Sequence, residues 1–198
     1  MRFHQLIQSA GGWGVRVREV LFSNPFLEVH RVQMVSPSRP EPFEWTVCHR
    51  KAGVCVVPRT PNGRLVLICQ ERVPIQSALW EFPAGQIDEA TGHSLDLVVQ
   101  TGLRELHEEA GYELGPGAEV RSLHYFHSSA GFADEHCYMI LADGVRQSAD
   151  GLHADPGEMI LEVREFSAEE VRAMVVSGQI RDANTLCSLA RLAALGEW

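Results

Sequence analysis

The sequence predicts an α+β fold, in which strands and helices are mixed along the chain rather than strictly alternating. Two observations carry this prediction. A tight hairpin signal lies near residue 60, and two helix signals close the chain after residue 166. Strict alternation of strand and helix would instead favour a doubly wound parallel sheet. The length of 198 residues suits one domain, or one domain plus a small appendage, and a composition of 45% hydrophobic and 22% charged residues is typical of a soluble globular protein.

The N-terminal residues are predicted to form extended segments. Val15, Val17 and Val20 lie in one of them, and residues 26–34 form a second, β-rich run. Three prolines in Ser36–Pro42 are expected to break this pattern. We therefore predict a β-rich extension over residues 1–47, followed by the main domain over residues 48–198.

The hairpin signal joins residues 52–58 to residues 64–69. Both runs are apolar, and Asn62-Gly63 between them supplies the positive φ of a tight turn at little cost. Further strands are expected over residues 137–141 and 159–166.

Two helices are predicted after residue 166. The first begins at Ser167, where Glu170 three residues later completes a capping box. The second runs from about Asp182 to Leu195. Its apolar side is expected to comprise Leu186, Leu189, Ala190 and Ala193.

An amphipathic helix earlier in the chain is predicted to end at Gly111, because helices commonly end at a residue in the left-handed backbone conformation. Its apolar stripe is expected to comprise Leu95, Val99, Leu103, Leu106 and Ala110.

Three glutamates of this helix, Glu105, Glu108 and Glu109, are expected to share a face that differs from the apolar stripe. Like charges at this spacing repel one another. One interpretation is a solvated acidic face, with Arg104 as the i,i+4 partner of Glu108. The other is a site for a hard cation, because clustered oxygen ligands suit Mg²⁺ or Mn²⁺. The glutamates alone leave both interpretations open.

Residues 104–112, Arg-Glu-Leu-His-Glu-Glu-Ala-Gly-Tyr, resemble the end of the Nudix box, G-x5-E-x7-R-E-U-x-E-E-x-G-U with U apolar. The beginning of the box departs from the pattern. Asp96 stands where the family has Glu, and Gly85 lies five residues too far upstream, which indicates a short insertion around residues 89–94. The chain is identified as a member of the Nudix hydrolase superfamily. This resemblance implies a mixed β-sheet sandwiched between helices in an α/β/α arrangement.

Residues 70–72, 80–85 and 180–186, together with the N-terminal extension, resemble the ADP-ribose pyrophosphatase branch. In that branch the extension commonly helps to form a homodimer. The resemblance implies Mg²⁺-dependent hydrolysis of the pyrophosphate bond of a nucleoside diphosphate sugar. The leading substrate is ADP-ribose, which would give AMP and ribose 5-phosphate.

Residues 127–132 lack the marker proline of ADP-ribose hydrolases, which leaves UDP-sugars and GDP-sugars as alternative substrates. An alternative of another class is a non-catalytic module that binds a nucleotide sugar. The three glutamates argue against such a module, because a pure binder has no need of mutually repelling carboxylates.

The resemblance also implies site residues. Glu105, Glu108 and Glu109, with the backbone carbonyl of Ala84, would bind Mg²⁺, for which Mn²⁺ can substitute. Arg104 would orient these carboxylates.

The catalytic base expected in this branch lies in a loop well after the box. Glu158 is the candidate, and Glu162 or a box glutamate such as Glu108 are alternatives. Glu158 as an ordinary loop carboxylate also stays open.

Substrate-binding candidates follow from the same branch. Arg72 resembles an arginine that contacts substrate, against the alternative of a surface salt bridge, and Glu135 follows a recognisable branch segment. Phe43 or Trp45 would stack on the base, although aromatic residues in strands more often belong to a core.

Charge and composition limit the classes of binding partner and the cellular location that we expect. The net charge of −9 argues against a nucleic-acid backbone, and no stretch reaches the length of a membrane span. The start of the chain has no apolar signal core, and five scattered cysteines suit a reducing compartment, so a cytoplasmic location is expected. His107, His124 and His127 show no metal-ligand spacing.

Overall fold

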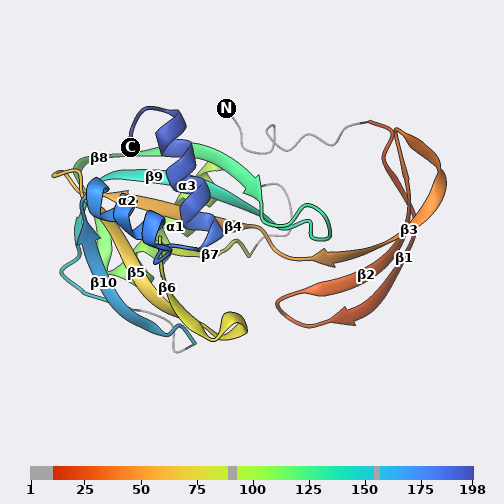
Figure 1. The fold of residues 1–198 in the computed structure, drawn as a ribbon, viewed down its shortest axis with the longest axis horizontal. Helices are drawn as coiled ribbons and strands as arrows, with labels where there is room; N and C mark the ends of the chain where they lie inside the picture. The colour runs from red at the N-terminus through yellow and green to blue at the C-terminus, as the bar shows by residue number, and fades with distance from the viewer. Residues whose placement is uncertain (1–10, 89–92, 154–156) are drawn as a thin grey trace.

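A computed structural model describes residues 11–88, 93–153 and 157–198, and Figure 1 presents its fold. A three-stranded antiparallel sheet is formed at the N-terminal end by β1 (Gly14–Ser23), β2 (Glu28–Ser36) and β3 (Arg39–His49). It lies to one side of a larger sheet that carries the helices (Figure 1). The β-rich segment expected before residue 48 is therefore present.

The larger sheet has seven strands in the described part of the chain. Its strands are β4 (Gly53–Arg59), β5 (Leu65–Arg72), β6 (Ser77–Glu81), β7 (Ala84–Gln86), β8 (Tyr112–His127), β9 (His136–Gln147) and β10 (Ile160–Phe166). Their order is β10-β5-β4-β9-β8, with β6 paired to β5 and β7 paired to β4, and a short 3-10 helix, η2 (Val73–Ile75), follows β5. Because β4 and β9 are parallel while the other pairs are antiparallel, the sheet is mixed.

Helices cover both faces of this sheet. Along β4, Val54 and Val56 pack in the cluster that includes α1 (Leu95–Ala110). The alternate residues Cys55 and Val57 pack in the cluster that includes α2 (Ala168–Ser177) and α3 (Ala183–Ala194). Since side chains of a strand alternate between faces, this separation confirms the predicted α+β sandwich of a mixed sheet between helices.

The predicted apolar stripe of α1 is confirmed at Leu95, Leu103, Leu106 and Ala110, which pack in the core. The packing of this helix differs from the prediction at the glutamates. Its buried side is centred on Gly102, and it includes Glu105 and Glu109, which are only 4% and 1% exposed. A separate face for these two glutamates was therefore a wrong prediction. The cause is the close approach of helix to sheet, since a Cβ on Gly102 would lie 2.7 Å from Cδ1 of Ile140. Gly111 ends the helix with φ +69°, as predicted.

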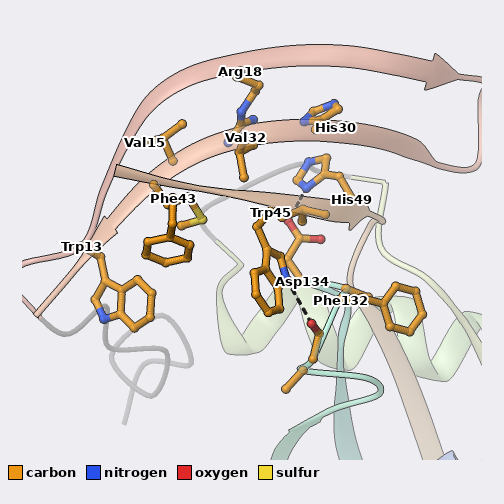
Figure 2. A pocket seen from close by; sticks show the side chains of 15 residues that line it. Trp13, Val15, Arg18, His30, Val32, Phe43, Trp45, His49, Phe132 and Asp134 are labelled. Atoms are coloured by element: carbon orange, nitrogen blue, oxygen red, sulfur yellow. Dashed lines mark hydrogen bonds and ion pairs between the residues drawn. The ribbon is translucent and has the colours of Figure 1, made fainter. Parts of the chain in front are cut away.

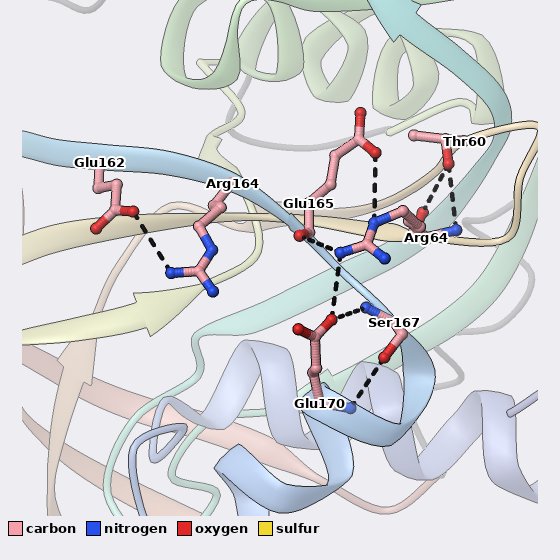
Figure 3. Close-up of polar contacts among 7 residues, drawn as sticks. All are labelled: Thr60, Arg64, Glu162, Arg164, Glu165, Ser167 and Glu170. Carbon is pink, nitrogen blue, oxygen red and sulfur yellow. Dashed lines mark hydrogen bonds and ion pairs between the residues drawn. The ribbon is translucent and has the colours of Figure 1, made fainter.

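The two C-terminal helices begin as predicted. Ser167 and Glu170 form the capping box of α2, and Arg64 donates to the Glu170 carboxylate at 3.2 Å, which ties α2 to the start of β5 (Figure 3). The predicted apolar side of α3 is confirmed for Leu186 and Leu189, which pack in the core, and wrong for Ala190 and Ala193, which are exposed. The helix also buries polar residues, such as Thr185, whose Oγ1 accepts the N–H of Phe82 at 2.9 Å.

Two turn signals had different outcomes. Gly63 adopts φ +75° and donates its N–H to the Thr60 carbonyl at 2.8 Å, which confirms the predicted tight turn. The predicted break over residues 36–42 is confirmed only at Pro37 and Ser38, which form the turn between β2 and β3, because β3 already begins at Arg39 and includes Pro40 and Pro42. β3 is an edge strand, and prolines two residues apart can both direct the missing N–H away from the neighbouring strand.

No helix among the described residues is long and apolar enough to cross a membrane. All five cysteines are free thiols.

Candidate functional site

Three carboxylates converge beside α1. Glu105, Glu109 and Glu158 each offer an oxygen atom that lies within 4.8 Å of the other two. α1 supplies the first two, and the segment just before β10 supplies the third. We call these three residues the carboxylate group.

The backbone of β7 fits closely against this group. Ala84 donates its N–H to Oε2 of Glu109 at 2.8 Å. A Cβ on Gly85 would lie only 1.9 Å from Oε1 of Glu105, so this carboxylate occupies space that only a glycine leaves open. The Ala-Gly pair of β7 therefore positions both α1 glutamates.

Burial makes this group unfavourable for negative charge. Burial first, and then the nearby Glu158 carboxylate, raise the pKa of Glu109 to about 8 and that of Glu105 to about 7. A bound divalent cation would offset the burial and the mutual repulsion together, and carboxylate oxygens are the ligands that Mg²⁺ prefers. The donor set therefore fits a hard divalent ion.

Arg104 connects the box glutamates from the outer side of α1. One of its Nη atoms lies 2.5 Å from Oε1 of Glu105, and the other lies 2.5 Å from Oε2 of Glu108. Glu108 stands outside the carboxylate group and is half-buried. The fold thus divides the predicted glutamates into a buried pair and an outer member.

The other acidic candidates lie apart from the carboxylate group. Glu162 points toward Arg164, 3.8 Å away on the same strand (Figure 3). Asp96 is exposed in the first turn of α1. Residues 89–92 of the predicted insertion, and Asp155 and Pro156 of the predicted base loop, lie outside the described residues.

A cleft of about 320 Å³ adjoins the carboxylate group, and Ala84, Gly85, Arg72 and Glu135 are among the residues that line it. Arg72 donates from Nε and Nη2 to Glu81 at 3.0 and 2.5 Å. Glu81 is 1% exposed, and its burial raises its pKa while Arg72 acts in the opposite direction. Arg72 is thus held in a fixed orientation rather than forming an exposed surface pair.

Glu135 lies at the other side of this cleft. It accepts from Oγ of Ser128 at 2.6 Å and pairs with Arg50 at 2.8 Å. Arg50, Gln86 and Asn184 also line the cleft, and none of them was a site candidate from sequence. Asn184 lies in a segment that resembles the pyrophosphatase branch, whereas isolated residues such as Arg50 and Gln86 carry no pattern that could have marked them.

A second pocket, of about 600 Å³, lies between the N-terminal sheet and the loop before β9. Figure 2 shows Trp13, Phe43 and Trp45 turned into it. The indole N–H of Trp45 donates to the Gly131 carbonyl at 3.2 Å, and the side chain is 49% exposed rather than core. We call this space the aromatic pocket.

The pocket and the cleft meet at two consecutive residues. Asp134 lines the aromatic pocket and pairs with His49, while Glu135 lines the cleft. The structure therefore places the predicted Phe43 and Trp45 in the aromatic pocket and the predicted Arg72 in the cleft.

The chain is similar to one protein family and to several known proteins. Residues 49–187 match the model of the NUDIX domain. An ADP-ribose pyrophosphatase of Bacillus subtilis is 27% identical over 175 residues, which are 88% of this chain and 89% of that protein. A methanol dehydrogenase activator of Bacillus methanolicus is 27% identical over 74% of each chain.

A solved structure described as an ADP compounds hydrolase has the same fold. It superimposes with a TM-score of 0.73 at 17% identity and covers 97% of this chain and 100% of its own.

Proposed function

This chain belongs to the NUDIX family of hydrolases, and on that premise we propose that it hydrolyses the pyrophosphate bond of ADP-ribose, giving AMP and ribose 5-phosphate, with Mg²⁺ as cofactor. The observation that carries the proposal is the buried carboxylate group beside the cleft that contains Arg72. A cation that binds between these two buried, mutually repelling glutamates and a diphosphate would account for their position on one helix.

The residues have separate roles in this proposal. Glu105, Glu109 and the carbonyl of Ala84 would hold Mg²⁺, for which Mn²⁺ can substitute, with Glu108 as an outer ligand oriented by Arg104. When bound, the ion neutralises diphosphate charge and lowers the pKa of water.

Two further residues would act on the substrate and on the attacking water. Arg72, oriented by Glu81, would contact phosphate oxygens through its guanidinium. Glu158 would accept the proton of the attacking water, because it is the carboxylate outside the box that lies beside Glu105 and Glu109.

Two observations support ADP-ribose as the substrate. The aromatic pocket offers Trp45 and Phe43 for stacking on a nucleotide base. The Bacillus subtilis relative is named an ADP-ribose pyrophosphatase. UDP-sugars and GDP-sugars remain the second candidates, because the loop over residues 127–132 lacks the proline that marks ADP-ribose hydrolases.

We further propose that two copies of the chain associate through the N-terminal sheet, in the cytoplasm. β1 exposes a set of large apolar side chains that a monomer would leave in water, namely Val15, Val17, Val20, Leu21 and Phe22. Five free thiols suit a reducing compartment.

The metal assignment is tested with Glu109→Gln, which keeps the side-chain volume and removes the charge. We expect kcat for ADP-ribose to fall by about 10² or more, because the ion loses a ligand. Glu169→Gln, an exposed change of the same type on α2, is the matched control. Normal turnover by Glu109→Gln would overturn the metal assignment.

The base is tested with a pair of neighbouring variants. Glu158→Gln is expected to lower kcat by about 10² or more, the usual size of a general-base contribution. Glu162→Gln should leave kcat unchanged, because Glu162 lies beside Arg164 rather than in the carboxylate group. The reverse pattern would move the assignment to Glu162.

The substrate is tested by phosphate release in a coupled assay with Mg²⁺, across ADP-ribose, UDP-glucose and GDP-mannose. The highest kcat/KM is expected for ADP-ribose. A preference for another nucleotide sugar would contradict that choice, while tight binding without turnover of any of them would favour a non-catalytic module.

A further inference from the structure

One carboxylate lies in the wall of the mainly apolar aromatic pocket. It belongs to Asp134, in the loop between β8 and β9. β3 supplies another wall through Phe43, Trp45 and His49, whose side chains share one face of the strand because they stand two residues apart or multiples of two. Aromatic rings and a carboxylate therefore line the same space (Figure 2).

The end of β3 holds Asp134 in place. Its Oδ1 accepts the N–H of Arg50 at 3.2 Å, and its own N–H donates to the Cys48 carbonyl at 3.2 Å. Its Oδ2 pairs with Nδ1 of His49, whose ring stacks on that of His30 with the centroids 5.8 Å apart. The carboxylate is thus fixed in the pocket wall, and its side chain is still 45% exposed.

Two other possible acceptors in this pocket are already occupied. The Gly131 carbonyl accepts the indole N–H of Trp45 at 3.2 Å. His30 is buried, and its Nε2 lies 2.7 Å from the Glu28 carboxylate. A carboxylate offers about four acceptor positions, so the contacts with the His49 ring and the Arg50 N–H leave Asp134 able to accept from a ligand.

We propose that Asp134 is a specificity-determining residue, which accepts a hydrogen bond from the exocyclic amino group of adenine. The inference rests on the proposed function, because it requires a base that stacks in the aromatic pocket. The amino group of adenine is a donor, whereas uracil and guanine carry a carbonyl oxygen at the corresponding position. An ionised carboxylate accepts hydrogen bonds but cannot donate them, so Asp134 favours ADP-ribose over UDP-sugars and GDP-sugars.

The anchoring of Asp134 strengthens this discrimination. Because His49 and the backbone of Arg50 hold the carboxylate before the substrate binds, little side-chain entropy is lost when the base arrives. An unrestrained carboxylate would have to be ordered first and would contribute less to the preference for adenine.

The test compares ADP-ribose with its 6-deamino analogue, in which hydrogen replaces the amino group of the base. In wild type, kcat/KM for ADP-ribose is expected to be higher by about tenfold or more, because the analogue offers Asp134 no donor. Asp134→Asn should bring this ratio to about one, mainly by raising KM for ADP-ribose, since an amide N–H₂ then faces the amino group. Its kcat/KM for the analogue should stay close to that of wild type.

Glu44→Gln is the matched control. It makes the same change from carboxylate to amide beside Trp45, but Glu44 is exposed and pairs with Arg31 at 3.8 Å on the other face of the N-terminal sheet. This variant should keep the wild-type ratio. If Asp134→Asn also keeps that ratio, or loses both substrates equally as a loop anchor would, the inference is wrong. A wild type without the preference overturns the inference whether or not Asp134→Asn folds.

Binding measurements separate this inference from the proposed function. Calorimetry compares AMP with its 6-deamino analogue in wild type and in Asp134→Asn. A preference for AMP that depends on Asp134, in a protein that does not hydrolyse ADP-ribose, would support the inference while the proposed function fails. Hydrolysis of ADP-ribose with a preference that does not depend on Asp134 would overturn the inference alone.

Discussion

Glu109 has the most perturbed environment among the box glutamates. Burial raises its pKa to about 8, while the N–H of Ala84 acts in the opposite direction. Between the ordinary pKa of a glutamate and about 8, the folded protein without metal therefore binds more protons than the unfolded chain. Its stability must fall as the pH rises through this range.

We predict that the metal-free protein loses thermal stability between about pH 5 and about pH 8 because Glu109 and Glu105 must ionise while buried. The melting temperature in EDTA, measured across this range, checks the prediction. Glu109→Gln should flatten the decline, and Mg²⁺ should raise the melting temperature most at the alkaline end. A melting temperature that rises with pH in EDTA would contradict this account.

Gly85 is the second residue on which the site depends. Gly85→Ala would place a Cβ 1.9 Å from Oε1 of Glu105, so the carboxylate must move away from β7. We expect hydrolysis to fall by about tenfold or more, with a higher Mg²⁺ requirement, since the ligands are displaced. Gly11→Ala is the control, because a Cβ there meets nothing within 4 Å. Activity and Mg²⁺ dependence equal to wild type would show that Glu105 tolerates the shift.

At the scale of elements, α1 and the sheet are joined through Gly102. A Cβ at this position would meet Cδ1 of Ile140 at 2.7 Å and Cγ2 of Val56 at 3.0 Å. The contact at Gly102 that brings α1 close to the sheet also places Glu105 and Glu109 against β7. Core packing and site geometry are therefore linked in one helix.

We predict that Gly102→Ala lowers the free energy of unfolding by about 1–3 kcal/mol, the usual cost of overpacking a core. Because the helix must move outward, turnover should fall as well. Urea unfolding and the coupled phosphate assay measure the two effects. A variant with lower stability but normal turnover would mean that the helix end at Glu109 does not follow the displacement at Gly102.

At the scale of the whole molecule, the N-terminal sheet exposes apolar surface that a second copy would cover. We predict that Val20→Glu, at a β1 side chain that is 55% exposed, shifts the protein from dimer to monomer. Sedimentation equilibrium measures the change. Val176→Glu, on α2 and 89% exposed, is the matched control and should leave the association unchanged. A monomeric wild type would contradict the proposed dimer.

Local signals in the sequence determined much of the fold. The turn at Gly63, the capping box at Ser167 and the helix end at Gly111 depend on neighbouring residues and were predicted correctly. The long strand β8 was not predicted, because Gly115-Pro116-Gly117 within it is typical of a turn, and the strand accommodates these residues at an irregularity in its pairing.

The sequence alone also determined the family, because residues 104–112 match the end of the Nudix box. It also predicted Glu158 as the candidate catalytic base. Only the tertiary structure decided which carboxylates meet. It buried Glu105 and Glu109, left Glu108 at the outer side with Arg104, and brought Glu158 to the pair. The physical reason is that helical spacing fixes the relative directions of side chains but not the side that packs, which here depends on the close contact of Gly102 with the sheet.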